Sequence, residues 1–173
     1  MDHQHKKILS IGAATAVMIA AAFIAVPALA TDPVGEFTPT PIFRGPGVFG
    51  PLDLKAEKND KWDLLLRSKG QTDLRLTTVA FGAHSSSGWH SHPGPNLLTV
   101  TVGEVVVYEG PLCTGTLIRA RGTFTDVGGS HIHLVRNESG SPAVIIAVAL
   151  YPHGVTPTLT SQPRPNNCPA NIL

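Results

Sequence analysis

The sequence predicts an all-β domain of short antiparallel strands, arranged as a sandwich or barrel. Short apolar and β-branched runs recur along most of the chain at a spacing of roughly 8–12 residues, which is typical of such folds. The breaks between these runs carry Gly, Pro, Ser or Asn, as at Gly110-Pro111 and Gly128-Gly129. The chain contains 17 Gly and 15 Pro among its 173 residues. This turn-rich composition argues against long helices, and the length fits one domain.

Residues 1–30 have the order of a secretory signal peptide. Lys6 and Lys7 form a basic start, Ile8–Val26 is an uncharged apolar run, and Ala28-Leu29-Ala30 is a small-x-small cleavage site. Because the apolar run is long for a signal, an uncleaved membrane anchor is the alternative. We predict cleavage after Ala30 and a mature protein that is secreted or held in the cell envelope or periplasm.

The mature chain is formally neutral. The full sequence has 13 basic and 12 acidic residues, and removal of Lys6, Lys7 and Asp2 with the signal leaves 11 of each. Binding to nucleic acid or to anionic membranes depends on a basic surface. The composition therefore excludes a generic binder of either kind, and we expect no membrane association after signal cleavage.

Three segments follow in the mature chain. Residues 31–60 begin rich in Pro and Gly and are predicted to be an extended arm or edge strand. Residues 61–155 are predicted to form the barrel, and residues 156–173 are a Pro- and Asn-rich tail expected to be irregular. The predicted strands are Trp62–Arg67, Asp73–Phe81, Leu97–Val102, Glu104–Glu109, Thr116–Arg119, His131–Arg136 and Ala143–Leu150.

The chain has two cysteines, Cys113 in a predicted loop and Cys168 in the tail. In an exported protein an even number of cysteines indicates a bridge, because exposed free thiols are a liability outside the cell. We predict a Cys113–Cys168 disulfide that ties the tail to the barrel.

Four histidines form two His-x-His pairs, His90-Ser91-His92 and His131-Ile132-His133. Residues two apart on a strand face the same side, so each pair can direct two imidazoles at one point. Imidazole is a common ligand of transition metals. The two pairs therefore predict a site for a divalent Fe, Mn, Zn, Ni or Cu ion.

The spacing around these pairs resembles the two motifs of the cupin family. Motif one reads His-x-His, a short spacer, Glu, six residues and Gly; here His90 and His92 precede Asn96 and Gly103. Motif two reads Gly, five residues, Pro-x-Gly, two residues, His, three residues and Asn; here Gly122 and Gly128-Gly129-Ser130 precede His133 and Asn137. The resemblance implies a jelly-roll barrel with a metal held by His90, His92 and His133.

The sequence departs from the cupin pattern at two places. Asn96 stands where the family has a metal-binding Glu, so it is either a weak ligand or forms a structural hydrogen bond. In motif two Gly128 and Ser130 replace Pro and Gly. His131 is additional, and it is either a weak ligand or lies outside the metal shell. Trp62 and Trp89 are predicted to pack rather than to contact a substrate.

The sequence contains no nucleophile motif and no phosphate-binding loop, so catalysis would run through the metal. Three-His cupins include iron-dependent dioxygenases, which makes a metal-dependent oxygenase acting on a small molecule the first hypothesis. No inward carboxylate is identified beside the site. The alternatives are a non-catalytic cupin that binds a metal or small ligand and a structural or storage-like cupin.

Leu98, Val100 and Val102 share the alternation of Asn96 and are predicted to line an apolar pocket. A homodimer formed through edge strands is a further expectation.

Overall fold

A computed structural model describes residues 29–43, 45–110 and 112–172. The predicted signal peptide lies outside these residues except for Leu29 and Ala30. The described ranges contain strands and no helix, and hence no helix that is long and apolar enough to cross a membrane.

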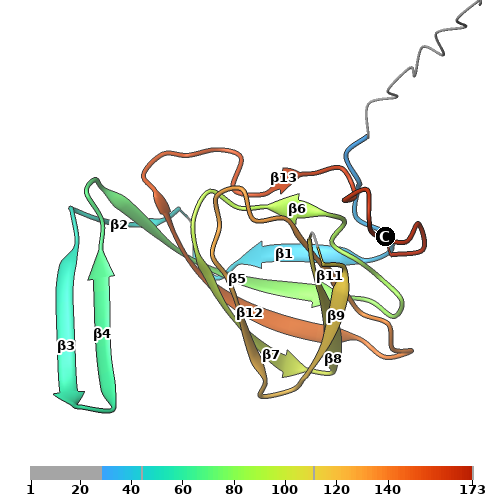
Figure 1. The fold of residues 1–173 in the computed structure, drawn as a ribbon, viewed down its shortest axis with the longest axis horizontal. Helices are drawn as coiled ribbons and strands as arrows, with labels where there is room; N and C mark the ends of the chain where they lie inside the picture. The colour runs from blue at the N-terminus through green and yellow to red at the C-terminus, as the bar shows by residue number, and fades with distance from the viewer. Residues whose placement is uncertain (1–28, 44, 111, 173) are drawn as a thin grey trace, which may run out of the picture.

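Two antiparallel sheets form the body of the molecule (Figure 1). The first has the order β1-β5-β12-β7-β10, with β2 also paired to β5, and the second has the order β13-β6-β11-β8-β9. The first sheet consists of β1 (Phe37–Pro41), β2 (Gly47–Phe49), β5 (Thr72–Phe81), β7 (Asn96–Val102), β10 (Thr123–Asp126) and β12 (Ala143–Pro152). The second consists of β6 (His90–Ser91), β8 (Glu104–Glu109), β9 (Thr114–Arg119), β11 (His133–Arg136) and β13 (Thr160–Ser161).

The strand order confirms the predicted antiparallel jelly roll. If β5 is counted as the first strand, one sheet has the order first, eighth, third and sixth, which are β5, β12, β7 and β10. The other sheet has the order second, seventh, fourth and fifth, which are β6, β11, β8 and β9. This interleaving of early and late strands is the double Greek key of a jelly roll. It brings β6 beside β11, and so brings the two histidine pairs together although they are far apart in the sequence.

The core lies between the sheets and follows the period-two alternation of the strands. In β12, Ala143, Ile145, Ala147, Ala149 and Tyr151 are buried, while the residues between them are more exposed. Ala143 and Ile145 belong to a buried cluster with Phe81, Val100, Val105, Val107 and Val135. Such alternation is expected where one face of a sheet packs on the core and the other faces solvent.

An irregularity in β7 corrects one prediction. Val144 pairs with Val102 and Ile145 with Val100, so Thr101 is skipped on the β7 side. This extra residue turns Val102 outward, and its side chain is 52% exposed. Val100 is fully buried in the core, and of the three residues predicted to line a pocket only Leu98 does so.

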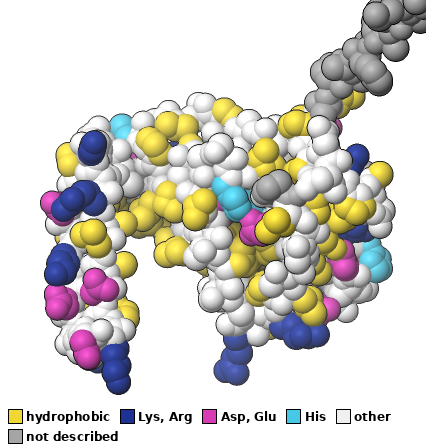
Figure 2. Space-filling model, viewed as in Figure 1, with side chains coloured by type: hydrophobic (Ala, Val, Ile, Leu, Met, Phe, Trp, Pro, Cys, Tyr) yellow, Lys and Arg dark blue, Asp and Glu magenta, His cyan; other side chains and the backbone are white. Residues whose placement is uncertain are grey.

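The N-terminal segment pairs with the barrel and then leaves it. β1 pairs along β5 at the edge of the first sheet. The following β3 (Asp53–Asn59) and β4 (Trp62–Arg67) pair only with each other, forming a hairpin that stands away from the two sheets (Figures 1 and 2). The predicted boundary between residues 60 and 61 falls in the turn of this hairpin.

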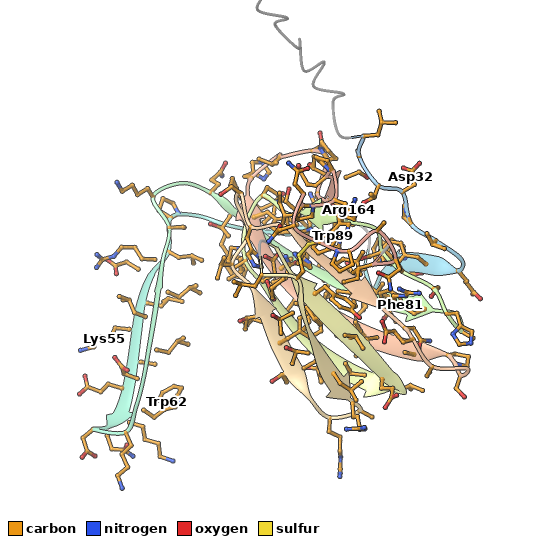
Figure 3. All side chains as sticks on the ribbon, turned by 45° about the vertical axis from the view of Figure 1, so that its right-hand side comes forward. Asp32, Lys55, Trp62, Phe81, Trp89 and Arg164 are labelled. Carbon is orange, nitrogen blue, oxygen red and sulfur yellow. A yellow bond between two sulfur atoms is a disulfide. The ribbon has the colours of Figure 1, made fainter. Side chains whose placement is uncertain are left out.

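The two tryptophans have opposite environments (Figure 3). Trp89 is fully buried, as predicted, and packs with Leu134, Cys168 and Ile172. Its indole Nε1 donates to the carbonyl oxygen of Ile172 at 3.1 Å. Trp62 was expected to pack, but it lies on the hairpin and is 52% exposed, because β4 has no third strand or second layer beside it.

Cys113 and Cys168 form the predicted disulfide, with Cα atoms 5.3 Å apart and a sequence separation of 55 residues. Replacing both by Ser is expected to lower the free energy of unfolding by about 4 kcal/mol, because the open chain regains the entropy of a long loop. Urea denaturation of the variant and of reduced wild type measures this loss. A loss below about 1 kcal/mol in both would contradict it.

Asp73 ties the end of β12 to β5. Its carboxylate accepts hydrogen bonds from His153 Nδ1 (2.6 Å), the Gly154 backbone N–H (3.3 Å) and Arg75 Nη2 (3.3 Å). The His153 hydrogen bond, supported by those of Gly154 and Arg75, lowers the pKa of Asp73 below 3.8 against the opposing effect of burial.

These contacts predict a specific dependence of stability on pH. Because the folded pKa is lowered, the contribution of Asp73 is complete above its unfolded pKa and is lost as the pH falls through the folded pKa. Asp73→Asn should therefore destabilise the protein at neutral pH, and progressively less as the pH falls below about 3.9, the ordinary pKa of Asp. Urea denaturation across this range measures the difference, with exposed Asp63→Asn as the control. A difference that does not change with pH would show that the ionised form is not responsible.

Candidate metal centre

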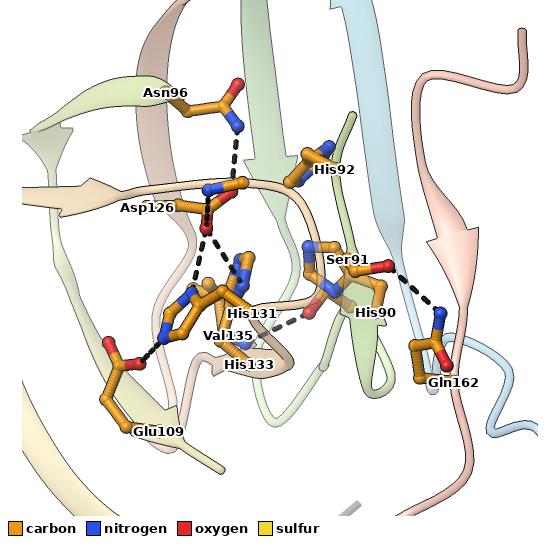
Figure 4. A network of polar contacts seen from close by, with 12 residues as sticks. His90, Ser91, His92, Asn96, Glu109, Asp126, His131, His133, Val135 and Gln162 are labelled. Atoms are coloured by element: carbon orange, nitrogen blue, oxygen red, sulfur yellow. Dashed lines mark hydrogen bonds and ion pairs between the residues drawn. The ribbon is translucent and has the colours of Figure 1, made fainter. Parts of the chain in front are cut away.

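Three histidines converge at one end of the barrel interior (Figure 4). His90 lies on β6, His92 follows that strand, and His133 begins β11, where it is the direct cross-strand partner of His90. Ring centroids are 4.9 Å apart for His90 and His92, 4.3 Å for His90 and His133, and 5.6 Å for His92 and His133. One ligand atom from each ring lies within 4.8 Å of the other two, so the group can hold a metal ion.

Backbone carbonyls determine which ring nitrogen is free in two of these histidines. His90 Nδ1 donates to the Gly88 carbonyl at 2.9 Å, and His92 Nδ1 donates to the Thr158 carbonyl at 2.7 Å. A carbonyl only accepts, so both Nδ1 atoms carry the proton in the neutral rings. The lone pair therefore lies on Nε2, as in histidines that bind a metal through Nε2 while Nδ1 holds the ring in place.

The local environment keeps these imidazoles neutral. Burial, and then the charges of His133 and His92, hold the pKa of His90 well below its ordinary value. Burial, with smaller effects of His92 and His131, lowers the pKa of His133 to about 3. Burial also lowers the pKa of His92, against the raising effect of the Thr158 hydrogen bond. Neutral imidazole is the form that binds metals, so no proton has to be displaced at neutral pH.

Asp126 is the residue that sequence reasoning missed. It ends β10 with 2% of its surface exposed, and one carboxylate oxygen lies 3.9 Å from His133 Nδ1. That Nδ1 is buried and has no hydrogen-bond partner within the described residues. The expectation that no inward carboxylate stands beside the site was therefore wrong. Recognising Thr123–Asp126 as a strand would have placed Asp126 on the inward face with Phe124.

Asn96 forms hydrogen bonds with its amide nitrogen and its oxygen. Its Nδ2 donates to Asp126 Oδ2 at 2.9 Å, and its Oδ1 accepts from the Tyr151 hydroxyl at 2.7 Å. Asn96 and Asp126 are direct cross-strand partners on β7 and β10. The Asn96 amide thus holds the Asp126 carboxylate in place.

His131 lies between two carboxylates at the edge of the site. Its Nδ1 is 2.8 Å from Asp126 Oδ1, and its Nε2 is 2.5 Å from Glu109 Oε2. Partial burial lowers its pKa, but the hydrogen bond to Asp126 and the charge of Glu109 outweigh this, so the net shift is upward. Asp126, His131 and His133 form a second group with ligand atoms within 4.8 Å, but both ring nitrogens of His131 already face carboxylate oxygens.

A cavity of about 330 Å³ opens in front of the three histidines. Its size is at the lower end of small-molecule sites, which span roughly 300–1,000 Å³. Apolar side chains from both sheets form most of its wall: Phe37, Val79, Phe81, Leu98, Val135 and Ile145. His90, His92, Asn96, Tyr151 and Thr158 line the polar part.

No protein-family model matches the chain, and no curated protein matches it. Solved structures that match include an oxalate oxidase, 23% identical over 44% of this chain and 41% of its own, with a TM-score of 0.40. A double-stranded β-helix protein from Klebsiella pneumoniae is 16% identical over 66% of this chain and 81% of its own, with a TM-score of 0.45. A cupin superfamily protein from Desulfitobacterium hafniense is 13% identical over 63% and 82%, with a TM-score of 0.41.

This chain spans about two fifths of the oxalate oxidase, 41% of its length. The fold assignment rests on this chain's own strand order and on the placement of its histidines. By the order of its two sheets, which places His90 of β6 directly beside His133 of β11, the chain has the antiparallel jelly-roll fold of the cupins.

Proposed function

We propose that this protein is an exported cupin that binds a divalent transition metal through His90, His92 and His133 and acts as an oxygenase on a small molecule. The observation that supports it is the convergence of three neutral imidazoles on a largely apolar cavity. A bound Fe, Mn, Zn, Ni or Cu ion with open positions would supply Lewis acidity or a place for a substrate oxygen or dioxygen.

The protein's own groups have separate roles in this proposal. The Gly88 and Thr158 carbonyls hold the rings of His90 and His92. Asp126 supplies a buried negative charge that offsets the loss of the family's Glu at position 96. Asn96 positions that carboxylate and His131 lies outside the metal shell, while the apolar wall holds the apolar part of a ligand and limits access of water.

Metal analysis of mature protein purified without a histidine tag tests the first part of this proposal. We expect about one equivalent of a transition metal, and less than about a tenth of an equivalent would overturn it. Oxygen uptake by Fe(II)-loaded protein with diols, thiols and flavonoids tests the second part. Uptake with one class supports an oxygenase, and a uniform absence of uptake would contradict it.

One observation favours a second candidate, a non-catalytic module that binds a metal or small ligand. Asp126, the buried carboxylate at the site, already accepts hydrogen bonds from Asn96, Gly128 and His131, so it is not free to act as a general base. Ligand binding without oxygen uptake would support this candidate.

Export and a homodimer are further parts of the proposal. The disulfide is compatible with an oxidising compartment. For the homodimer, the β3–β4 hairpin provides a surface: one face carries Leu54, Ala56, Leu64 and Leu66, with Trp62 near the turn. Lys55 and Trp62 point to opposite sides of the hairpin (Figure 3). A two-stranded hairpin is marginally stable alone, so a partner that covers its apolar face stabilises it.

A second copy of this chain offers a matching uncharged surface. Leu97, Ile146 and Val148 lie together on the outward face of β7 and β12. We expect a dimer by light scattering, and Leu64→Glu should convert it to a monomer. Leu65→Glu lies on the opposite face of the hairpin and serves as the matched control. A monomeric wild type, or equal effects of both variants, would contradict this interface.

A further inference from the structure

One guanidinium reaches the cavity from β5. Arg75 alternates with Thr77, Val79 and Phe81 on the inward side of that strand, and all four residues line the cavity that contains the histidines. The Arg75 side chain is 29% exposed, so most of it is enclosed by protein. The described residues that line this cavity include no other Lys or Arg, and no Asp or Glu.

The hydrogen-bonding capacity of Arg75 is only partly used. Its Nη2 donates to Asp73 Oδ2 at 3.3 Å, but the same carboxylate also accepts from His153 and from the Gly154 backbone. The Arg75 Nε is buried and has no hydrogen-bond partner within the described part of the chain. Leaving a buried donor of a charged group unpaired is costly. The hydrogen bond to Asp73 therefore holds the Arg75 guanidinium in place but leaves its Nε–H without a partner among the described residues.

The position of Arg75 relates it to the histidine end of the cavity. On the first sheet Arg75 pairs with Ala149, and Ala149 pairs with Asn96 on its other side. Two strand spacings separate Arg75 from Asn96, about 10 Å, and the small side chain of Ala149 lies between them. The Tyr151 hydroxyl, which donates to Asn96, lies 3.2 Å from His92 Nδ1. A small molecule in the cavity can thus lie between Arg75 and the histidines.

We propose that the cavity binds a small organic carboxylate, with its carboxylate on Arg75, its apolar body against the side chains of both sheets and its other end at the histidine cluster. Arg is suited to this task because its planar fork of N–H groups matches the two oxygens of a carboxylate. The inference rests on the proposed function and refines it by naming the class of substrate.

Binding of two matched probes tests this inference. Para-fluorophenylacetate and its neutral amide, para-fluorophenylacetamide, have nearly the same shape and can be titrated against the protein by fluorine NMR. We expect wild type to bind the carboxylate at least about tenfold more tightly than the amide, a difference of about 1.4 kcal/mol. Arg75→Gln should abolish this preference while leaving the affinity for the amide and the metal content unchanged.

Two further variants serve as controls. Arg119→Gln removes an arginine on β9 that pairs with Glu104 at the surface and is 72% exposed, so it should keep the preference. Arg75→Lys retains the charge without the fork, so it should keep only part of the preference, and it serves if Arg75→Gln does not fold. Equal affinities of wild type for the two probes, or a preference that survives in the Arg75 variants, would overturn the inference.

The same titrations on metal-free protein separate this inference from the proposed function. If the purified protein does not bind metal but shows a carboxylate preference that depends on Arg75, the metal site is refuted and the anion site is supported. A protein that retains metal but shows no preference would do the reverse.

Discussion

His92→Ala is expected to reduce the metal content of the purified protein from about one equivalent to below about a tenth. The substitution leaves two imidazoles, whereas protein sites for such metals ordinarily use at least three side-chain ligands. Because His92 is more accessible than His90 and His133, its loss should disturb the core least of the three. Elemental analysis of the variant, with circular dichroism as a check on folding, measures the effect.

His84 provides a matched control for this experiment. It lies on an exposed loop with a φ of 55°, so Asn is the suitable replacement because it tolerates the left-handed region. His84→Asn should retain the full metal content. Unchanged metal in His92→Ala would show that the ion is held elsewhere.

Asp126→Asn is expected to weaken metal binding about 10- to 100-fold, the usual effect of losing an outer carboxylate partner, because it removes the negative charge 3.9 Å from His133 Nδ1. It should also lower the free energy of unfolding by about 3 kcal/mol, because a buried charge with three hydrogen-bond donors around it is replaced by a neutral amide. Competition with a chelator measures the metal affinity, and urea denaturation measures the stability.

The cross-strand pair of Asn96 and Asp126 allows a sharper test. In the double variant Asn96→Asp, Asp126→Asn, the amide and the carboxylate exchange strands while the pair keeps one negative charge. We expect it to recover most of the affinity lost in Asp126→Asn. No recovery would indicate that the position of the carboxylate, and not its charge, determines the affinity.

Local patterns were enough to predict much of the fold. Trp62–Arg67 and Glu104–Glu109 were predicted with the bounds that the structure has, since turn residues flank both runs. The short strands β6, β10 and β13 were missed because each is too short for an alternation of apolar and polar residues to be recognised. The predicted strand at His131 begins instead at His133, because His131 turns toward Asp126 and Glu109.

The residues of the site also divide into those that the sequence predicted and those that it did not. The His-x-His spacing predicted that the two histidines of each pair share one face, and the resemblance to the two cupin motifs then implied His90, His92 and His133 as the set. Asp126 and Arg75 could not be found by spacing, since they come from β10 and β5 and reach the site only through pairing across strands. The outward turn of Val102 depends on an irregular register that alternation alone does not predict.

The sequence by itself therefore determined the fold class, the three convergent histidines and the disulfide. These follow from short-range periodicity, from the resemblance to the two cupin motifs, and from the few partners that two cysteines can have. The tertiary structure decided which charges surround the histidines and that the hairpin stands apart from the barrel. Those features depend on long-range strand pairing, which brings together residues whose separation in the sequence carries no information about their distance in space.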